Sequence, residues 1–382
     1  MTKKLYDTNS MLWEFDAQVV SCTPVNDAYA VVLDRTAFYP EGGGQPFDIG
    51  TLGDVQVSAV HEKNGEIVHT VSSPLPIDMT VHGAIDGARR LALMQNHSGE
   101  HIVSGLVNSR HGFDNTGFHM GHDVMTIDFN GALDADALAE IERLANEAVR
   151  ANIPVETRLP SPEELAAMTY RSKKALSGEV RIVCIEGIDA CACCGTHVQR
   201  TSGVGLIKLL NAEKHKNGTR VEMLCGADAF ADYHRKHENN LAISRLLSAK
   251  PNETPQAVQA LLETEQRLNN EIADLRRRIV DMLDEQTEIR NDLAIVFDNN
   301  LTADDARRLG TLLGERTKAA LVCVGSDAIG YRYVVVSAIA NELSAKLNAR
   351  FNGRGGGKPP LAQGQLQGAR TDIQEFWQQC HS

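Results

Sequence analysis

Two short stretches of this sequence each place two potential metal ligands four residues apart, and this pairing constrains the fold more than any other feature. His97 and His101 lie in HSGEH, and Cys193 and His197 lie in CACCGTHV. Side chains four residues apart share one face of a helix, so both imidazoles of the first pair can reach one ion. The His/His/Cys/His set suits Zn²⁺ in a tetrahedron. If the two pairs share an ion, segments distant in the sequence must meet in the fold.

The cysteine cluster leaves alternatives open. Spacing alone does not assign the sulfur ligand, because Cys191 and Cys194 are neighbours of Cys193. The sequence has no apolar run of the kind that forms a signal peptide or a membrane span, so we expect a cytoplasmic protein without a membrane partner and with reduced thiols. A redox pair would use Cys191 and Cys194, and an inert buried cluster is a further alternative. We favour zinc, which could staple the fold, activate a water molecule or polarise a substrate.

A competing motif overlaps the histidine pair. HSGEH also fits the H-x-x-E-H pattern of some zinc metallopeptidases, in which the glutamate is a general base. Those enzymes take a downstream carboxylate as their third ligand rather than a C-x-x-x-H pair, which disfavours a peptidase. The sequence therefore predicts that Glu100 is an ordinary residue on the helix surface.

The chain of 382 residues is long enough for several domains. Alternating apolar runs and turns predict a small β-barrel-like domain over 1–90. A helix over 89–112, further strands and a helix N-capped by Asp134 predict an α+β zinc-binding domain over 91–235. We expect a helical coiled-coil linker over 236–296 and a small C-terminal α/β domain over 297–382. The predicted fold class is thus α+β and multidomain.

The linker prediction rests on a heptad pattern. Apolar residues recur with heptad spacing between Val258 and Leu293, with interruptions at Glu265 and Gln286. The pattern predicts a coiled coil or a helical hairpin, and a helix over 258–293 would be roughly 50 Å long. Such a helix could separate two RNA-binding ends, or it could join two copies of the chain in a homodimer, for which the C-terminal domain is the alternative contact.

Four stretches, in this order, resemble the editing domain of alanyl-tRNA synthetases and the AlaX family of alanyl-tRNA editing proteins. They are FYPEGGGQPFDIG (38–50), NHSGEHIVSG (96–105), CACCGTHV (191–198) and FNGRGGGKPPLAQG (351–364). The resemblance covers essentially the whole chain. It departs from the family at Cys194, which stands where a C-G-G-T-H motif has its first glycine. No segment resembles the class II aminoacylation core, and no Asp-His-His triplet occurs, so we expect neither a complete synthetase nor a phosphoesterase.

The resemblance implies a trans-acting deacylase of mischarged Ser-tRNA(Ala), with Gly-tRNA(Ala) as a second substrate. Its zinc ligands would be His97, His101, Cys193 and His197. Gln45 would line the aminoacyl pocket, and Thr36 would lie near the seryl hydroxyl. A pocket whose polar groups hydrogen-bond the seryl hydroxyl would not hydrolyse the alanyl ester efficiently, because bound alanine would leave those pocket groups unpaired. The alternative is a non-catalytic tRNA-binding or assembly factor with a structural zinc.

The RNA contact has to be local, since the net charge of −12 gives no general attraction for nucleic acid. The C-terminal motif GRGGGKPP is our candidate: Arg354 and Lys358 flank Gly355, Gly356 and Gly357, whose backbone N–H groups could meet a phosphate. Pro359 after the lysine excludes a Walker loop. A flexible turn is the alternative for this segment.

Overall fold

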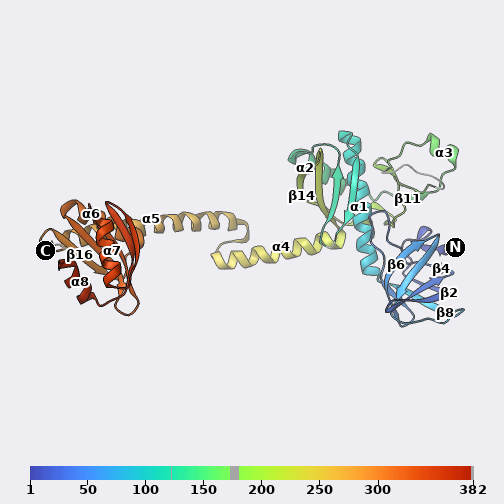
Figure 1. Cartoon of the computed structure of the whole chain (residues 1–382). Helices are drawn as coiled ribbons and strands as arrows, with labels where there is room; N and C mark the ends of the chain where they lie inside the picture. Colours follow the sequence, from blue (N-terminus) through green and yellow to red (C-terminus); the bar gives the residue numbers. More distant parts are fainter. Residues whose placement is uncertain (122, 173–179, 380–382) are drawn as a thin grey trace. The chain divides into compact units, whose positions relative to one another are not determined.

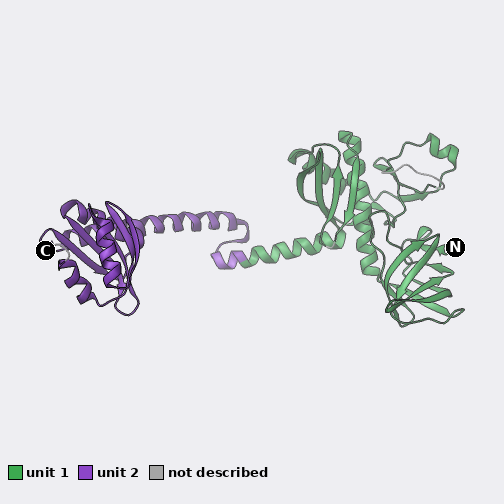
Figure 2. Ribbon diagram, viewed as in Figure 1, with its two compact units in different colours: residues 1–242 green, residues 243–382 purple. Residues whose placement is uncertain are grey.

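The chain forms two compact units in the computed structural model, which describes residues 1–121, 123–172 and 180–379 (Figures 1 and 2). Unit 1 is Met1–Ala242 and unit 2 is Ile243–Ser382. The division falls within helix α4 (Gly226–Leu247). Among the described helices, none combines the length and the apolar character needed to cross a membrane.

Unit 1 begins with a closed antiparallel barrel in the order β2-β3-β7-β6-β5-β8. Along β2, Phe15, Ala17 and Val19 are buried and alternate with exposed polar residues, as the pleat of a strand requires. Short β1 (Lys3–Lys4) pairs in parallel with β4 (Arg35–Thr36), and the glycine-rich loop 37–49 follows β4. The barrel strands are β2 (Glu14–Val25), β3 (Ala28–Leu33), β5 (Gly50–Leu52), β6 (Val55–Lys63), β7 (Glu66–Val71) and β8 (Thr80–Ile85).

Helix α1 (Gly87–His111) leaves the barrel and runs through the rest of unit 1 (Figure 1). Its N-cap is Asp86, whose side chain accepts from the Arg89 N–H at 3.0 Å, and it ends at Gly112 in the left-handed region. A Cβ at Gly105 would overlap the Ile188 carbonyl, so glycine here lets α1 approach the segment before β13. The predicted helix over 89–112 is confirmed.

Two further sheets complete unit 1. One has the order β14-β15-β10-β9 and shares a core with α1 and α2, including Ile102, Ile127 and Ile141. Asp134 accepts from the Ala137 N–H at 2.8 Å, so the predicted N-cap of α2 is confirmed. The other sheet has the order β11-β12-β13. The elements are β9 (Asn115–Met120), β10 (Met125–Phe129), α2 (Ala135–Ala151), β11 (Val155–Arg158), α3 (Pro162–Ala167), β12 (Ile182–Ile185), β13 (Asp189–Ala192), β14 (Ile207–His215) and β15 (Gly218–Cys225).

Unit 2 contains a sheet in the order β16-β17-β18-β20-β19 with apolar clusters on both faces. One cluster includes Leu343 and Trp377 from α7 and α8, and the other includes Val280 and Leu309 from α5 and α6. The elements are α5 (Thr254–Gln286), β16 (Leu293–Asp298), α6 (Ala303–Arg316), β17 (Ala319–Ser326), β18 (Gly330–Ser337), α7 (Ala340–Arg350), β19 (Arg354–Lys358), β20 (Leu361–Leu366) and α8 (Arg370–Gln379).

The heptad helix is shorter than predicted. Helix α5 ends at Gln286, and Leu293, the last residue of the heptad pattern, begins strand β16. Asn291 and Asp292 have positive φ angles of 53° and 61°, which form the turn between the two elements. The heptad side chains Leu261, Leu268, Leu275 and Met282 remain 45–57% exposed.

The glycine-rich motif near the C-terminus is a strand, so the alternative of a flexible turn is wrong. Residues Arg354–Lys358 form β19, one of the two edge strands of the sheet, which pairs with β20. A Cβ at Gly355 or Gly357 would overlap the backbone of β20, so glycine permits this close pairing. Arg354 and Lys358 are exposed.

Candidate metal centre

The two ligand pairs come from different elements of unit 1. His97 and His101 project from α1, and both are 2% exposed. Cys193 and His197 follow strand β13, where Arg181 donates from Nη1 to the Cys193 carbonyl at 2.7 Å and to the Gly195 carbonyl at 2.9 Å. These bonds hold the turn that carries the second pair.

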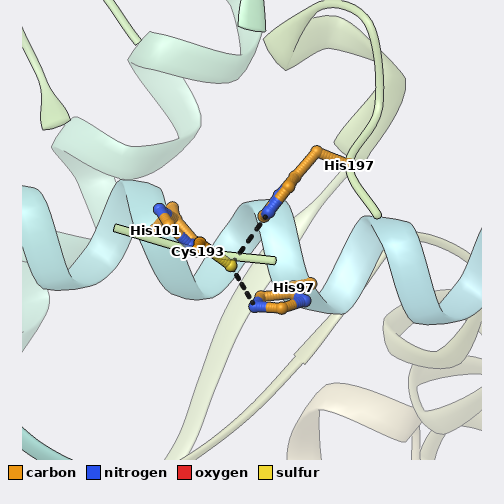
Figure 3. Close-up of side chains that lie close together, drawn as sticks. All are labelled: His97, His101, Cys193 and His197. Carbon is orange, nitrogen blue, oxygen red and sulfur yellow. Dashed lines mark hydrogen bonds between the residues drawn. The ribbon is translucent and has the colours of Figure 1, made fainter. Parts of the chain in front are cut away.

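The structure brings the four side chains to one point (Figure 3). One ligand atom of each of His97, His101, Cys193 and His197 lies within 4.8 Å of the others. The sulfur of Cys193 is 3.4 Å from His97 Nε2 and 3.5 Å from His197 Nε2. With metal–nitrogen and metal–sulfur bonds of about 2.1 and 2.3 Å, tetrahedral ligands would be about 3.6 Å apart. The set therefore fits a four-coordinate metal ion.

Gln45, from the glycine-rich loop of the barrel, orients the first imidazole. Its Oε1 lies 2.8 Å from His97 Nδ1 and accepts from the Thr196 N–H at 3.1 Å, while its Nε2 donates to Thr196 Oγ1 at 2.8 Å. Because the amide oxygen only accepts, His97 Nδ1 carries the proton and Nε2 remains free for a metal. Gln45 is fully buried and joins the two ligand pairs.

The other imidazoles are oriented in the same way. His101 Nδ1 lies 2.9 Å from Asp189 Oδ2, and His197 Nδ1 lies 3.2 Å from Ser98 Oγ. Occupied Nδ1 atoms leave the Nε2 atoms to face the ion, as in metal sites whose ligands are held by an outer layer of hydrogen bonds. The outer layer uses an amide for His97, a carboxylate for His101 and a hydroxyl for His197.

The electrostatics suit a thiolate ligand. Burial by itself would raise the pKa of the Cys193 thiol, but the charge of His97 and the hydrogen bonds of His101 and His197 bring that pKa well below its ordinary value. Burial lowers the pKa of His197 to about 3, which keeps this imidazole neutral. Burial by itself would lower the pKa of His101, but its hydrogen bonds to Asp189 and Cys193 raise that pKa well above its ordinary value. Metals bind a thiolate and a neutral imidazole, so a metal has to displace a proton from His101.

The neighbouring cysteines lie elsewhere. Cys191 is buried and forms a second close group with His101 and Asp189. Cys194 is exposed and lines a pocket of about 310 Å³ together with Tyr39, Gly42 and Arg181. Cys193 is partly exposed as a residue, whereas the three histidine ligands are buried.

Thr36 lies within the barrel and is fully buried. Its hydroxyl oxygen is 2.9 Å from His69 Nε2 and accepts from the Phe38 N–H at 3.1 Å. His69 Nδ1 is 3.1 Å from the Val31 carbonyl, which only accepts. His69 Nε2 is therefore the acceptor for the Thr36 hydroxyl, and burial lowers the pKa of His69 to about 4.

A buried ion pair attaches the ligand helix to the barrel loop. Arg90, two turns before His97 on α1, donates from Nε to both carboxylate oxygens of Asp48, at 2.9 and 3.0 Å, and from Nη2 to the Ala37 carbonyl. Asp48 also accepts from the Tyr39 N–H at 2.6 Å, which closes the loop that holds Gln45. Arg90 and Asp48 are both 0% exposed.

Glu100 differs from its predicted place on the helix surface. It is 2% exposed, accepts a hydrogen bond from the Ser104 hydroxyl at 2.7 Å, and bonds to the Asn115 amide. This carboxylate supports α1 from inside unit 1. Sequence analysis also missed Asp189, although its position two residues before Cys191 placed a carboxylate beside the ligand cluster.

Comparisons with known proteins agree with this architecture. The protein-family model described as "Threonyl and Alanyl tRNA synthetase second additional domain" matches residues 180–222, and "tRNA synthetases class II (A)" matches residues 6–89. The second match contains the segment 38–50, one of the four stretches that resemble the editing domain of alanyl-tRNA synthetases. The matched residues 6–89 include all six barrel strands.

Similar proteins extend the match to nearly the full chain. Alanyl-tRNA editing protein AlaX-L of Pyrococcus horikoshii is 30% identical over 98% of this chain and 96% of its own length. Alanyl-tRNA editing protein Aarsd1 of Danio rerio is 29% identical over 92% of this chain and 90% of its own. An alanine–tRNA ligase of Methanococcus maripaludis is 29% identical over 98% of this chain and 43% of its own length.

A barrel joined by one helix to a domain with a His/Cys group, matched by these two family models, defines a protein of the alanyl-tRNA synthetase-related class. Within that class, the similarity to AlaX-L over nearly both full lengths decides the assignment. The chain belongs to the AlaX family of alanyl-tRNA editing proteins.

Proposed function

We propose that the chain is a trans-acting, zinc-dependent hydrolase that acts in the cytoplasm on mischarged tRNA(Ala). Its substrate is Ser-tRNA(Ala), with Gly-tRNA(Ala) as a second substrate. The observation that carries the proposal is the convergence of His97, His101, Cys193 and His197, with the Nδ1 atom of every imidazole already bonded. The names of the relatives, alanyl-tRNA editing proteins, support the choice of tRNA as the partner.

The chain supplies positioning and selectivity for this reaction. His97, His101, Cys193 and His197 would hold the zinc, which when bound supplies a Lewis-acidic positive charge for ester hydrolysis. We assign the aminoacyl end of the tRNA to the pocket lined by Tyr39, Gly42 and Cys194, the residue that directly follows the ligand Cys193 in the chain. Gln45 fixes the ligand helix against the pocket loop, so the substrate meets a preformed site.

Hydrolysis assays separate this proposal from its alternative. The purified chain, with its zinc content measured, is incubated with Ser-tRNA(Ala), Gly-tRNA(Ala) and Ala-tRNA(Ala), and ester loss is followed. We expect rapid loss of the seryl ester and little loss of the alanyl ester. Tight tRNA binding without hydrolysis of any ester would instead favour a non-catalytic tRNA-binding or assembly factor with a structural zinc.

Thr36 stays our candidate for recognising the seryl hydroxyl. Because it is fully buried, is bonded to His69 and to the Phe38 N–H, and does not line the pocket assigned to the aminoacyl end, this role requires its hydroxyl to exchange those partners for the substrate. The change Thr36→Val keeps the volume but removes the oxygen that pairs with His69 and with the Phe38 N–H. We expect kcat/KM for Ser-tRNA(Ala) to fall about 10- to 100-fold, because the variant has no hydroxyl to bond the seryl group, while the alanyl rate does not fall. The measurement is the seryl-to-alanyl ratio of kcat/KM.

Thr201→Val is the matched control for Thr36→Val. Thr201 is also fully buried, donates to the Ala148 carbonyl at 2.7 Å and accepts from the Ile153 N–H at 2.8 Å. We expect this variant to keep the wild-type ratio. A ratio that is unchanged in Thr36→Val, or lowered equally in both variants, would remove Thr36 from the recognition of serine.

The edge strand β19 is our candidate for tRNA contact. Arg354 and Lys358 are exposed at its two ends, with Gly355, Gly356 and Gly357 between them. Replacing both cations by alanine should weaken tRNA binding about tenfold. The slope of the logarithm of the affinity against the logarithm of the salt concentration should become shallower by about one to two. Arg143→Ala with Lys236→Ala removes the same charge elsewhere and should leave the affinity unchanged. Equal affinity of both double variants would contradict the assignment.

The exposed heptad face of α5 is our candidate for a homodimer contact. Leu268, Leu275 and Met282 are 45–55% exposed, a large apolar stripe for a single helix. Leu268→Glu with Leu275→Glu should give a monomer by light scattering, because charges would face each other in the seam. Gln259→Glu with Gln266→Glu, off the seam, should keep the dimer. A wild-type chain with the mass of a monomer would exclude the homodimer.

A further inference from the structure

One ligand histidine, His101, has a charged partner that is itself held by a second charge. Arg171 donates from Nε to Asp189 Oδ1 at 2.7 Å and from Nη2 to Asp189 Oδ2 at 2.8 Å, while the same Oδ2 lies 2.9 Å from His101 Nδ1. The side chains of Asp189 and Arg171 are 1% and 14% exposed. The carboxylate therefore bridges a guanidinium and an imidazole inside unit 1.

The backbone of Arg171 is attached to the same strand. Its N–H donates to the Ala190 carbonyl at 2.8 Å, and its carbonyl accepts from the Ala192 N–H at 2.9 Å. These bonds place Arg171 beside β13, with a parallel bridge to Cys191. Strand β13 contains Asp189 and ends immediately before the ligand Cys193. Arg171 therefore contacts, through both its side chain and its backbone, the strand that precedes the sulfur ligand.

We propose that Asp189, held in place by Arg171, is a positioning residue that fixes His101 as an Nε2 ligand of the metal. The inference rests on the proposed function only in assuming that this centre binds a metal. The carboxylate bonds the Nδ1–H of His101, so Nε2 is the nitrogen presented to the metal, and the bond makes Nε2 a stronger donor once a metal has displaced its proton. The bidentate guanidinium, with two parallel hydrogen bonds, prevents the carboxylate from rotating away.

His101 is thereby the most firmly oriented of the three imidazoles. His97 and His197 bond to a neutral amide and a neutral hydroxyl, at 2.8 and 3.2 Å. Charge-assisted hydrogen bonds are about twice as strong as neutral ones. Loss of the Asp189 charge should therefore weaken metal binding even though all four ligand side chains remain.

The test uses Asp189→Asn in the full-length chain. Zinc affinity of the metal-free protein is measured by competition with a chelator, and the visible absorption of the cobalt(II) form reports the geometry of the ligands. We expect the affinity to fall about 10- to 100-fold and the cobalt spectrum to change, with little change in the thermal unfolding of the metal-free protein. Neither readout requires tRNA.

Asp128→Asn is a matched control in the same unit. Asp128 forms the same bidentate pair with Arg220, at 2.7 and 2.9 Å, and lies 3.7 Å from His215 Nε2, but it belongs to strand β10. We expect wild-type zinc affinity in this variant. Wild-type affinity in Asp189→Asn, or equal losses in both variants, would overturn the proposal.

Arg171→Lys keeps the Asp189 carboxylate and removes only the planar fork, so it tests the pair if Asp189→Asn does not fold. We expect a loss of zinc affinity of about threefold to tenfold from the loss of the bidentate geometry. An unchanged affinity would show that Arg171 does not hold Asp189 for the metal. A wild-type chain that binds zinc but leaves Ser-tRNA(Ala) intact would refute the proposed function and not this inference.

Discussion

Replacing His101 by alanine is expected to remove the metal and the hydrolysis of Ser-tRNA(Ala) together. The change deletes one of four converging ligands and leaves Asp189 without its imidazole partner. Because removing one ligand weakens zinc binding at a site arranged for four, zinc should fall below about 0.1 per chain after dialysis against a chelator. The deacylation rate should fall at least about a thousandfold. Elemental analysis and a seryl-ester assay on the same sample measure both quantities.

His82→Ala is the control for this variant, since His82 is an exposed barrel residue away from the four ligand side chains. It should keep wild-type zinc content and activity. A His101→Ala protein with normal zinc content would contradict the ligand set. A protein that loses its zinc and retains full activity would contradict the catalytic use of the metal and would favour a structural one.

Removing the carboxylate of Asp48 is expected to produce the largest loss of stability in unit 1. Asp48→Ala would leave the Arg90 guanidinium buried without its countercharge and would remove the acceptor for the Tyr39 N–H. Breaking a buried pair from one side costs about 3–5 kcal/mol in the free energy of unfolding. Urea denaturation, followed by Trp13 fluorescence in a Trp377→Phe background, reports unit 1 separately from unit 2.

Glu147→Ala provides the comparison for this stability measurement. Glu147 pairs with Arg143 at 2.6 Å on the surface of α2, where the two side chains are 47% and 57% exposed. Such a pair contributes under about 0.5 kcal/mol. If Asp48→Ala were no less stable than Glu147→Ala, the ion pair would not be what attaches α1 to the barrel loop.

Local spacing was the most informative sequence signal. A separation of four residues placed His97 and His101 on one face of α1, and the structure has both imidazoles facing the same point. The pairs could be matched across the sequence because few residue types bind a metal with that geometry. The Asp134 cap was predictable for the same reason, since an N-cap needs only its own first turn.

Partners that depend on tertiary burial were not predictable. Glu100 and Asp189 are carboxylates, which usually lie at the surface, and only the folded chain shows the donors that allow their burial. For Gln45 we predicted a place in the aminoacyl pocket, which stays a prediction, and did not foresee that its three hydrogen bonds join the ligand pairs, because these bonds depend on Thr196. The sequence around Gln45 and around Thr196 contains no pattern that predicts their contact.

In unit 2, the structure differs from the sequence predictions at the end of the heptad helix and at the glycine-rich segment, and in both places the chain forms a strand that pairs with a neighbouring strand. The heptad pattern continued to Leu293 because it records apolar spacing and not backbone direction, so the turn at Asn291 and Asp292 passed unnoticed. The segment Arg354–Lys358 looked like a loop because glycine disfavours strands. Its pairing with β20, which requires close backbone approach, outweighs that preference.

Helix α1 anchors Arg90 in the barrel loop and presents His97 two turns later. A helix turns by about 100° per residue, so one residue inserted between these positions would swing both imidazoles away from Cys193. Homologous chains should therefore gain or lose residues in the surrounding turns and hairpins but keep the count between this arginine and the first histidine. Grafting a foreign barrel onto the remainder of unit 1 would succeed only if the helical phase were preserved.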